Sequence, residues 1–328
     1  MYVFFTISFI LKKISTIIKM VIKMKRIAVS KTGKIKTINE ALSMIKLNEE
    51  AIIEIDKGIF NEKILIDNPN ITIRGKGIDK TIITYNDYSK KIHKDNRDYN
   101  TFRTATMNII ANGCKITDLT IENSTTDLSK GQSVALSVYG NKTVIENCKI
   151  KSLHDTLFLG PLPDDLKERY TNFLSIKELF IEGSIYSRFT NCIIEGSIDF
   201  IFGTGSSLFE NCSIISKGKG YVVAPAHSMF QKTGFVFKNC HFINETNEEN
   251  SVYLLRFWRP YGITHFIDCE YDNHIIEEGI IGWNNKNPQV FSRVYEYPSS
   301  SNRADWMNTL SNYEYQKILD NIKKEFNF

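Results

Sequence analysis

The chain has 328 residues, of which 42% are hydrophobic and 24% charged, and these ordinary values exclude a largely disordered chain. The net charge is only +4, and no dense Lys/Arg run with interleaved aromatic residues occurs, so a nucleic-acid partner is excluded. This length usually predicts about two domains, but a repeat array can use it as one continuous unit.

The N-terminal segment, residues 1–23, has no single interpretation. Residues 1–11 are apolar, but no Lys or Arg precedes them, and the lysines from Lys12 onward keep the run shorter than the roughly 18 apolar residues of a membrane span. We expect residues 1–23 to be an atypical secretion signal, an interfacial anchor or an extension upstream of the true start. The protein is secreted in the first case and otherwise expected to be cytoplasmic. No other membrane contact is expected.

A short helix is predicted next, because Thr37-Ile38-Asn39-Glu40 has the form of a capping box and apolar residues follow at helical spacing. Short β-branched runs follow at residues 52–55, 64–66, 71–73 and 81–84. No helical pattern long enough for a crossover helix separates them. This pattern favours a parallel β-helix, an all-β solenoid, over residues 24–290, with the early helix covering its first exposed edge.

A repeated phrase, hydrophobic-x-Asn-Cys-x-hydrophobic, marks the coils of this solenoid. It occurs at residues 145–150, 189–194, 209–214 and 237–242. Four of the six cysteines belong to it, and no Cys-x-x-Cys pair suggests a metal site. We therefore expect free thiols stacked inside the coils rather than disulfides, and we expect no metal and no cofactor.

Two segments fall outside the coil pattern. Residues 161–179 are rich in Pro, Asp, Lys and Glu and lie between two repeats, so a loop beside the functional site is predicted. Residues 291–328 are expected to form a helical tail packed along the coils, because apolar residues such as Leu310, Ile318 and Ile322 alternate with Lys and Glu.

The phrase also serves as a ruler for two carboxylates. Asp155 lies seven residues after Cys148, and Asp199 lies seven residues after Cys192. Both should occupy the same position of neighbouring coils, about 4.8 Å apart, where one is driven toward its protonated form. Solenoids also stack Asp residues at their turns, where the side chains hydrogen-bond the backbone. The apolar neighbours of Asp199 favour a functional role instead. Gln132 precedes Asp155 by 23 residues, about one coil, so its amide could serve as an oxyanion donor.

The chain here resembles the pectin methylesterases, which are carbohydrate esterases, from about residue 27 to residue 283. The segments that carry the resemblance are Gly75-Lys76-Gly77-Ile78-Asp79-Lys80-Thr81, Thr101-Phe102-Arg103-Thr104-Ala105-Thr106, Gln132-Ser133-Val134-Ala135-Leu136, His154-Asp155-Thr156-Leu157-Phe158 and the Asp199 segment. The resemblance implies a right-handed parallel β-helix. It also implies Asp199 as nucleophile, Asp155 as general acid/base and Gln132 as one of two oxyanion-hole amides.

By the same resemblance, Arg256 pairs with the nucleophile and Trp258 contacts the sugar, because a strand period of two puts both on one face. A rival register gives the arginine role to Arg259, and ordinary surface packing is the alternative for Trp258. Phe202 and Phe158 are further candidates for the sugar platform, with core packing as the equal alternative for both.

His154 departs from the family pattern, which has Gln as its second oxyanion donor. A neutral imidazole donates one hydrogen bond, so the role can survive but depends on tautomer and pH. Losing such a donor typically costs about 10²–10³ in rate, which affects how good an enzyme this is more than whether it is one.

The implied substrate is pectin or a methylated oligogalacturonide, imported if the protein is cytoplasmic, and a monomer is expected. Two alternatives stay open at this point. A β-helical glycoside hydrolase also uses paired carboxylates, about 5–5.5 Å apart in retaining enzymes. A pectin-binding β-helix with weakened catalysis is the other, because His154, Leu255 and Phe257 depart from the family motifs.

Overall fold

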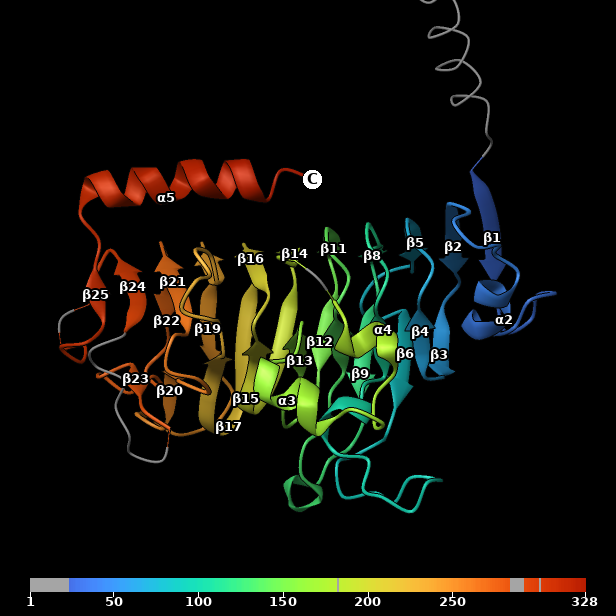
Figure 1. The fold of residues 1–328 in the computed structure, drawn as a ribbon, viewed down its shortest axis with the longest axis horizontal. Helices are drawn as coiled ribbons and strands as arrows, with labels where there is room; N and C mark the ends of the chain where they lie inside the picture. Colours follow the sequence, from blue (N-terminus) through green and yellow to red (C-terminus); the bar gives the residue numbers. More distant parts are fainter. Residues whose placement is uncertain (1–23, 182, 284–291, 301) are drawn as a thin grey trace, which may run out of the picture.

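The computed structural model describes residues 24–181, 183–283, 292–300 and 302–328 and shows a parallel β-helix whose coils stack along one axis (Figure 1). All pairings between its named strands are parallel, as predicted. The coils have three faces. The first face is an 11-stranded sheet, in the order β1 (Lys25–Val29), β2 (Ala51–Ile55), β5 (Ile71–Arg74), β8 (Lys115–Thr117), β11 (Thr143–Glu146), β14 (Tyr186–Thr190), β16 (Ser206–Glu210), β18 (Phe235–Lys238), β21 (Ile263–Ile267), β24 (Arg293–Tyr297) and β25 (Asn308–Thr309).

The other two faces merge into a 14-stranded sheet, because two long strands bend from one face onto the other. These are β15 (Ile193–Gly203) and β17 (Ser213–Pro225). The second face also holds β3 (Gly58–Asn61), β6 (Thr81–Tyr85), β9 (Thr120–Asn123), β12 (Lys149–Lys151), β19 (His241–Asn244) and β22 (Glu270–Tyr271). The third face holds β4 (Ile64–Ile66), β7 (Met107–Ile109), β10 (Leu136–Val138), β13 (Leu157–Leu159), β20 (Val252–Arg256) and β23 (Ile280–Ile281).

The Asn of the repeated phrase forms the turn between the first and second faces. Asn147, Asn191, Asn211 and Asn239 have φ of 50°, 52°, 55° and 52°, a left-handed conformation that Asn tolerates better than other residues with a side chain. Their amides also form a ladder: Asn191 Nδ2 donates to Asn147 Oδ1 at 3.4 Å, and Asn239 Nδ2 donates to Asn211 Oδ1 at 3.4 Å. The phrase therefore encodes the corner of each coil.

The hydrophobic and cysteine positions of the phrase stack inside the solenoid. Phe189, Phe209 and Phe237 form a stack with ring centroids 4.8 Å and 4.6 Å apart. All six cysteines are free thiols, and all but Cys269 are buried, which confirms the prediction of stacked thiols without disulfides. The core is thus a set of ladders in which neighbouring coils place apolar side chains at the same position.

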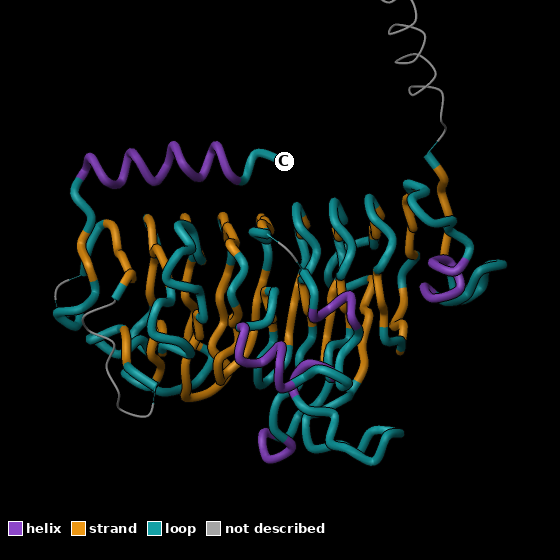
Figure 2. Tube along the Cα trace, in the orientation of Figure 1, coloured by secondary structure: helices purple, strands orange, loops and turns teal. Residues whose placement is uncertain are grey.

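Helices cover parts of this stack (Figure 2). The predicted first helix is α2 (Ile38–Ser43), and it lies beside β1 and β2. The Thr37 side chain accepts from the Glu40 backbone N–H as expected, but the Glu40 carboxylate accepts from the Lys36 N–H at 3.1 Å instead of from Thr37. The reciprocal half of the predicted capping box is therefore shifted by one residue.

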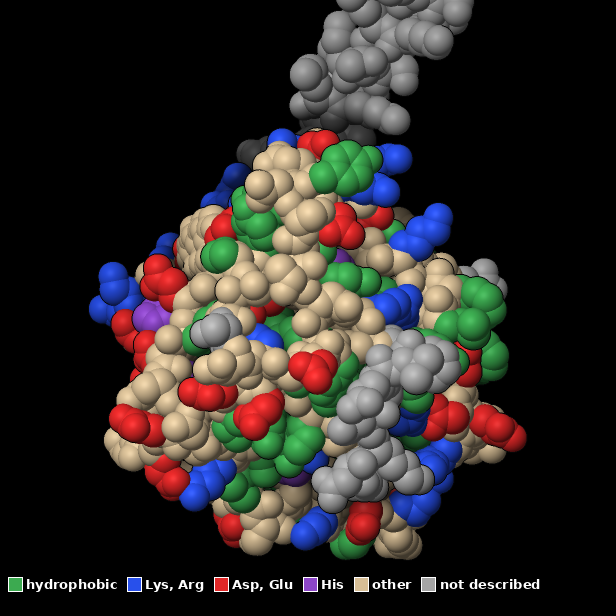
Figure 3. Space-filling view, turned by 90° about the vertical axis from the view of Figure 1, so that its left-hand side faces the viewer, with side chains coloured by type: hydrophobic (Ala, Val, Ile, Leu, Met, Phe, Trp, Pro, Cys, Tyr) green, Lys and Arg blue, Asp and Glu red, His purple; other side chains and the backbone are tan. Residues whose placement is uncertain are grey.

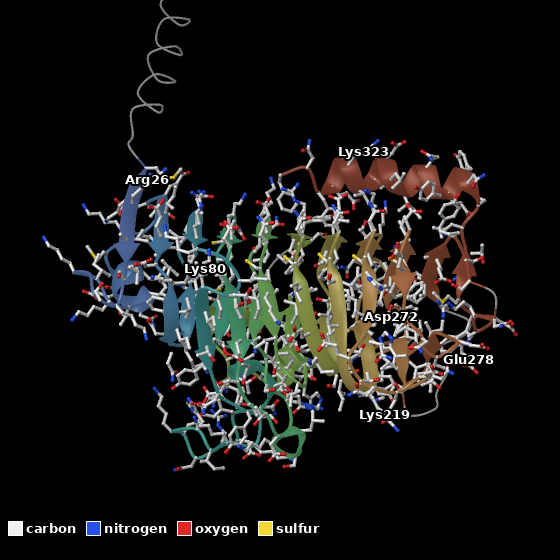
Figure 4. All side chains as sticks on the ribbon, turned by 180° about the vertical axis from the view of Figure 1, so that it is seen from behind. Arg26, Lys80, Lys219, Asp272, Glu278 and Lys323 are labelled. Atoms are coloured by element: carbon white, nitrogen blue, oxygen red, sulfur yellow. The ribbon has the colours of Figure 1, made fainter. Side chains whose placement is uncertain are left out.

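The C-terminal helix α5 (Asn312–Glu325) lies along the first face. Its Ile322, and Phe326 just after it, pack against Leu208, Val236 and Ile267 of three successive strands. Lys323 lies on the outer side of this helix, as the reverse view shows (Figure 4). The expected boundary at residues 290 and 291 lies outside the described residues, and β24 and β25 still belong to the sheet beyond it. The expected role of residues 1–23 also falls outside the described residues.

The segment between β13 and β14 that interrupts the coils is called the insert, residues 162–181. It contains two short helices, α3 (Asp164–Arg169) and α4 (Ile176–Leu179), which lie in front of the coils in Figure 1. Two 3-10 turns, at Thr101–Arg103 and Leu128–Lys130, lie in the other long loops. The end of the solenoid in Figure 3 mixes acidic and basic side chains. None of the helices in the described part of the chain is long and apolar enough to cross a membrane.

The left-handed corner gives a first prediction. Replacing Asn211, which is exposed with φ of 55°, by Val should lower the free energy of unfolding by about 1–3 kcal/mol, because a β-branched residue is strained there. Asn211→Gly is the matched control and should cost less than about 1 kcal/mol, since glycine adopts this φ freely. Urea midpoints of the two variants test this, and equal losses would contradict the corner role.

Candidate active site

The strand register brings the two aspartates together. Leu157 pairs with Ile201 between β13 and β15, and His154 forms a parallel bridge with Ile198, so Asp155 stands opposite Asp199. The Asp155 N–H donates to the Ile198 carbonyl at 3.0 Å. Neighbouring strands in a sheet are about 4.8 Å apart, as the ruler required. The prediction that the two residues share a position in neighbouring coils is confirmed.

Both aspartates sit at the corner between the second and third faces, in a strained backbone conformation. Asp155 has φ of 58° and Asp199 φ of 47°, and their exposed fractions are 7% and 6%. Left-handed conformations of residues with a side chain cost about 1–3 kcal/mol and cluster at functional sites. The corner thus presents two nearly buried carboxylates to one side of the coil.

Arg256, at the end of β20, clamps Asp199. Its Nε donates to Asp199 Oδ1 at 2.7 Å and its Nη2 donates to Oδ2 at 2.5 Å, a bidentate pair that fixes the carboxylate plane. Arg259 pairs instead with Asp165 of the insert, so the rival register is wrong. The structure brings the predicted arginine and the predicted nucleophile together.

Two aromatic residues that the sequence reasoning missed hold Arg256 in place. The guanidinium carbon lies 3.9 Å from the Tyr221 ring centroid and 4.1 Å from that of Trp283, which places both aromatic rings against the cation. Tyr221 lies 22 residues after Asp199, about one coil further, but nine rather than seven residues after Cys212, because β15 and β17 shift register between Gly196 and Ile201, so the ruler passes over it. Trp283 had no comparable spacing signal.

The two carboxylates have different electrostatic surroundings. The pKa of Asp155 is raised to about 6, mainly by burial; His154 opposes the rise, and the Asp199 charge adds to it. The pKa of Asp199 is also raised overall by burial, but there the hydrogen-bonded Arg256 opposes the rise. Only Asp199 has a guanidinium partner, so it is the carboxylate better held as an anion, and Asp155 is the one better held as an acid.

His154 contacts Asp155 in this structure. Its Nε2 lies 3.1 Å from Asp155 Oδ1, and its Nδ1 is buried without a hydrogen-bond partner. Burial lowers the pKa of His154, but its bond to Asp155 and the negative charges of Asp155 and Asp199 together outweigh this, and the pKa is raised overall. The predicted oxyanion role requires one N–H to point at the substrate, so it stays a prediction. Gln132 is fixed through its backbone, which exchanges hydrogen bonds with Ser89 at 2.8 Å and 3.1 Å.

The aromatic wall beside the carboxylates corrects one prediction. Phe202 meets Trp258 with ring centroids 5.8 Å apart, and both line the cavity. Phe158 is fully buried between Phe102 and Tyr139, beneath Phe202, so it cannot contact a sugar. Its role is core packing, the alternative that its residue type left open.

One cavity of about 690 Å³ contains the site. Seven of the eight predicted residues line it: Gln132, His154, Asp155, Asp199, Phe202, Arg256 and Trp258. The insert contributes a wall through Asp165, Leu166, Arg169 and Tyr170, which confirms the prediction that it lies beside the site. Among the described residues, no group of three or more His, Cys, Asp or Glu is arranged to hold a metal.

A parallel β-helix with two facing carboxylates, one of them clamped by arginine, in an aromatic-walled cavity defines a β-helical carbohydrate-active enzyme. The model of one such family, described as Pectinesterase, matches residues 25–161 and 182–324, and the chain belongs to this family. It is therefore a carboxylic ester hydrolase rather than the glycoside hydrolase considered as an alternative. The unmatched gap between the two ranges coincides with the insert.

Individual relatives agree with this assignment. The chain is 30% identical over 291 residues to probable pectinesterase/pectinesterase inhibitor 13 of Arabidopsis thaliana, spanning 84% of this chain but only 42% of that protein. It is 27% identical over 307 residues to pectinesterase 31 of the same plant, spanning 89% of each. A crystal structure of a pectin methylesterase in complex with a hexasaccharide matches with a TM-score of 0.73 and 25% identity, over 90% of this chain and 95% of that one. These structures are right-handed parallel β-helices, which confirms the predicted fold.

The unequal surroundings of the two aspartates predict opposite effects on stability. In Asp155→Asn, the free energy of unfolding should rise by about 1–3 kcal/mol at pH 8 and change little near pH 4. The sign follows from the raised pKa of about 6, against an ordinary 3.8. The folded protein holds a proton that the unfolded chain releases, so the stabilising contribution of Asp155 is lost as the pH rises through about 6.

Asp199→Asn is the matched control for this prediction. It leaves the Arg256 guanidinium without its carboxylate and should lower stability at pH 8. Thermal or urea unfolding of both variants at pH 4 and pH 8 gives the comparison. A loss of stability in Asp155→Asn at pH 8 would contradict the inferred cost of its buried charge.

Proposed function

We propose that this chain removes methyl esters from galacturonate units of pectin or its oligosaccharides, with Asp199 as nucleophile and Asp155 as general acid and base. The observation that carries the proposal is the bidentate Asp199–Arg256 pair beside a carboxylate whose pKa is raised to about 6. One group is held ready to attack as an anion, and its neighbour is able to supply a proton.

The first half of the reaction is acyl transfer. An Asp199 oxygen attacks the ester carbonyl carbon, and the Gln132 amide stabilises the developing oxyanion, aided by His154 if its N–H turns to the substrate. The bond to the methoxy oxygen then breaks, and the proton of Asp155 goes to the leaving methoxide. Methanol departs, and an anhydride between the galacturonate carbonyl and Asp199 remains.

The second half restores the enzyme. Asp155, now a carboxylate, takes a proton from a water molecule whose oxygen attacks the galacturonate carbonyl carbon. The anhydride bond breaks, Asp199 leaves as a carboxylate, and Asp155 is again protonated. The galacturonic acid product loses its proton to solvent. Every group in this sequence comes from one chain, so the protein is proposed to act as a monomer.

The substrate assignment has two supports. Solved pectin methylesterases similar to this chain are complexes with hexasaccharides, so related cavities accept oligosaccharides. In this chain, Trp258 and Phe202 form an apolar wall next to the carboxylates, the kind of surface on which a sugar ring packs.

Product analysis tests the proposed reaction. Methylated pectin should yield methanol without new reducing ends, and Asp199→Ala should lower the rate by at least about 10³-fold because it removes the nucleophile. Wild-type protein that releases no methanol would overturn the proposal and favour a binding role. New reducing ends would instead indicate glycoside hydrolysis.

The contact between His154 and Asp155 predicts a change in pH dependence. Below its raised pKa, His154 is a cation that favours the ionised form of Asp155, which opposes the acid role. His154→Gln should therefore keep activity within about tenfold of wild type, or raise it, and flatten the fall in kcat/KM on the acid side. His241→Gln, remote and paired with Asp272, is the control and should leave the profile unchanged. An inactive His154→Gln protein would contradict this view.

A further inference from the structure

The insert, residues 162–181, is the part of the site that the family model leaves out. The register step from Leu136 to Leu157 is 21 residues, and the step from Leu157 to Ile201 is 44 residues, so this coil carries about 23 extra residues. These extra residues build one wall of the catalytic cavity. Whatever this wall recognises is therefore a property of this chain beyond the shared catalytic groups.

The insert is bonded on one side to the loop that contains Asn100 and Arg103. The Arg103 guanidinium lies 3.6 Å from the Phe173 ring centroid, and its Nη2 donates to the Phe173 carbonyl at 2.7 Å. The Tyr170 hydroxyl donates to Asn100 Oδ1 at 2.9 Å. Leu166 and Tyr170 also pack into the aromatic cluster that contains Phe202. Helix α3 is thus fixed beside the carboxylates.

The insert is also bridged to the far side of the cavity. Arg259, which follows β20, donates from Nη2 to Asp165 Oδ2 at 2.5 Å and from Nε to Asp165 Oδ1 at 3.3 Å. This bidentate pair joins the start of α3 to the segment that carries Trp258. The insert therefore spans the width of the site along the C-terminal ends of β13, β15, β17 and β20.

Among the described residues that line the cavity, one arginine has no carboxylate partner. Arg256 is paired with Asp199, and Arg259 with Asp165. Arg169, the last residue of α3, also lines the cavity and is exposed, and within the described residues it forms no ion pair with a carboxylate. Its guanidinium lies beside the Tyr170 hydroxyl, where burial raises the pKa of the hydroxyl and the cation lowers it. A cation presented in this way is available to an anionic ligand.

We propose that Arg169 is a specificity residue that binds the free carboxylate of a galacturonate unit neighbouring the ester under attack, so that the preferred substrate is partly de-esterified pectin. This inference rests on the proposed function. A galacturonate polymer presents a carboxylate wherever a methyl ester has been removed, and the planar guanidinium fork matches a carboxylate with two hydrogen bonds. Fully methylated chains offer no such partner.

The test compares Arg169→Gln with wild type on a fully methylated and a partly de-esterified oligogalacturonide. KM for the partly de-esterified substrate should rise about 3- to 10-fold with kcat little changed, and the effect should shrink in high salt. KM for the fully methylated substrate should stay the same. Lys167→Gln is the matched control, since Lys167 lies on the same helix but pairs with Asp164 and faces a different cavity.

A binding measurement separates this inference from the proposed function. Calorimetry with a fully de-esterified oligogalacturonide should show tighter binding to wild type and Lys167→Gln than to Arg169→Gln. If wild type releases no methanol but this difference is present, the proposed function fails and the carboxylate site stands. If Arg169→Gln matches wild type in binding and in both KM values, or raises both KM values equally, the carboxylate site is wrong.

Discussion

The parallel register between coils is the constraint on which the whole molecule depends. Each coil adds one strand to each face at a fixed spacing, so a residue at one position of a coil has a defined neighbour in the next. This rule stacks Phe189 on Phe209 in the core and Asn191 on Asn147 at the corner. The same rule sets Asp155 opposite Asp199. The site is therefore a ladder in which the repeated residue carries charge rather than apolar surface.

Two ionised carboxylates are unfavourable in neighbouring coils, and the surrounding side chains stabilise the charge of one more than that of the other. Two facing carboxylates at 7% and 6% exposure each favour the protonated state of the other. Arg256 favours the ionised form of Asp199 above all, and the rings of Tyr221 and Trp283 lie against the Arg256 guanidinium. The asymmetry between the proposed acid and the proposed nucleophile thus comes from the next coils along the axis, while the two aspartates themselves occupy equivalent positions.

Spacing in the sequence predicted the features that repeat. The repeat of the coils, the free thiols and the pairing of Asp155 with Asp199 all follow from the Asn-Cys phrase and the distance to it, and strand parity selected Arg256 over Arg259. Spacing could not predict which side chains are buried by loops that are distant in the sequence. Phe158 and Phe202 pair in register and have similar neighbours, yet Phe158 is covered by Phe102 from a loop more than 50 residues earlier. Tyr221 was missed although the coil spacing reaches it, because β15 and β17 shift register between Gly196 and Ile201.

The loops that covered Phe158 also explain how a regular solenoid acquires a pocket. A face of parallel strands is nearly flat, and the depth of this cavity comes from segments that the coil period does not specify: the loop around Phe102 and the insert. These two segments bind each other through Arg103 and Phe173. Because the catalytic ladder belongs to the coils and the wall belongs to the loops, substitutions in the insert can change which galacturonate sequence is bound while the register of Asp155 and Asp199 stays intact. The proposed chemistry and the proposed selectivity are therefore assigned to different parts of the chain, which are joined at contacts such as Asp165 with Arg259, where the insert meets the coils.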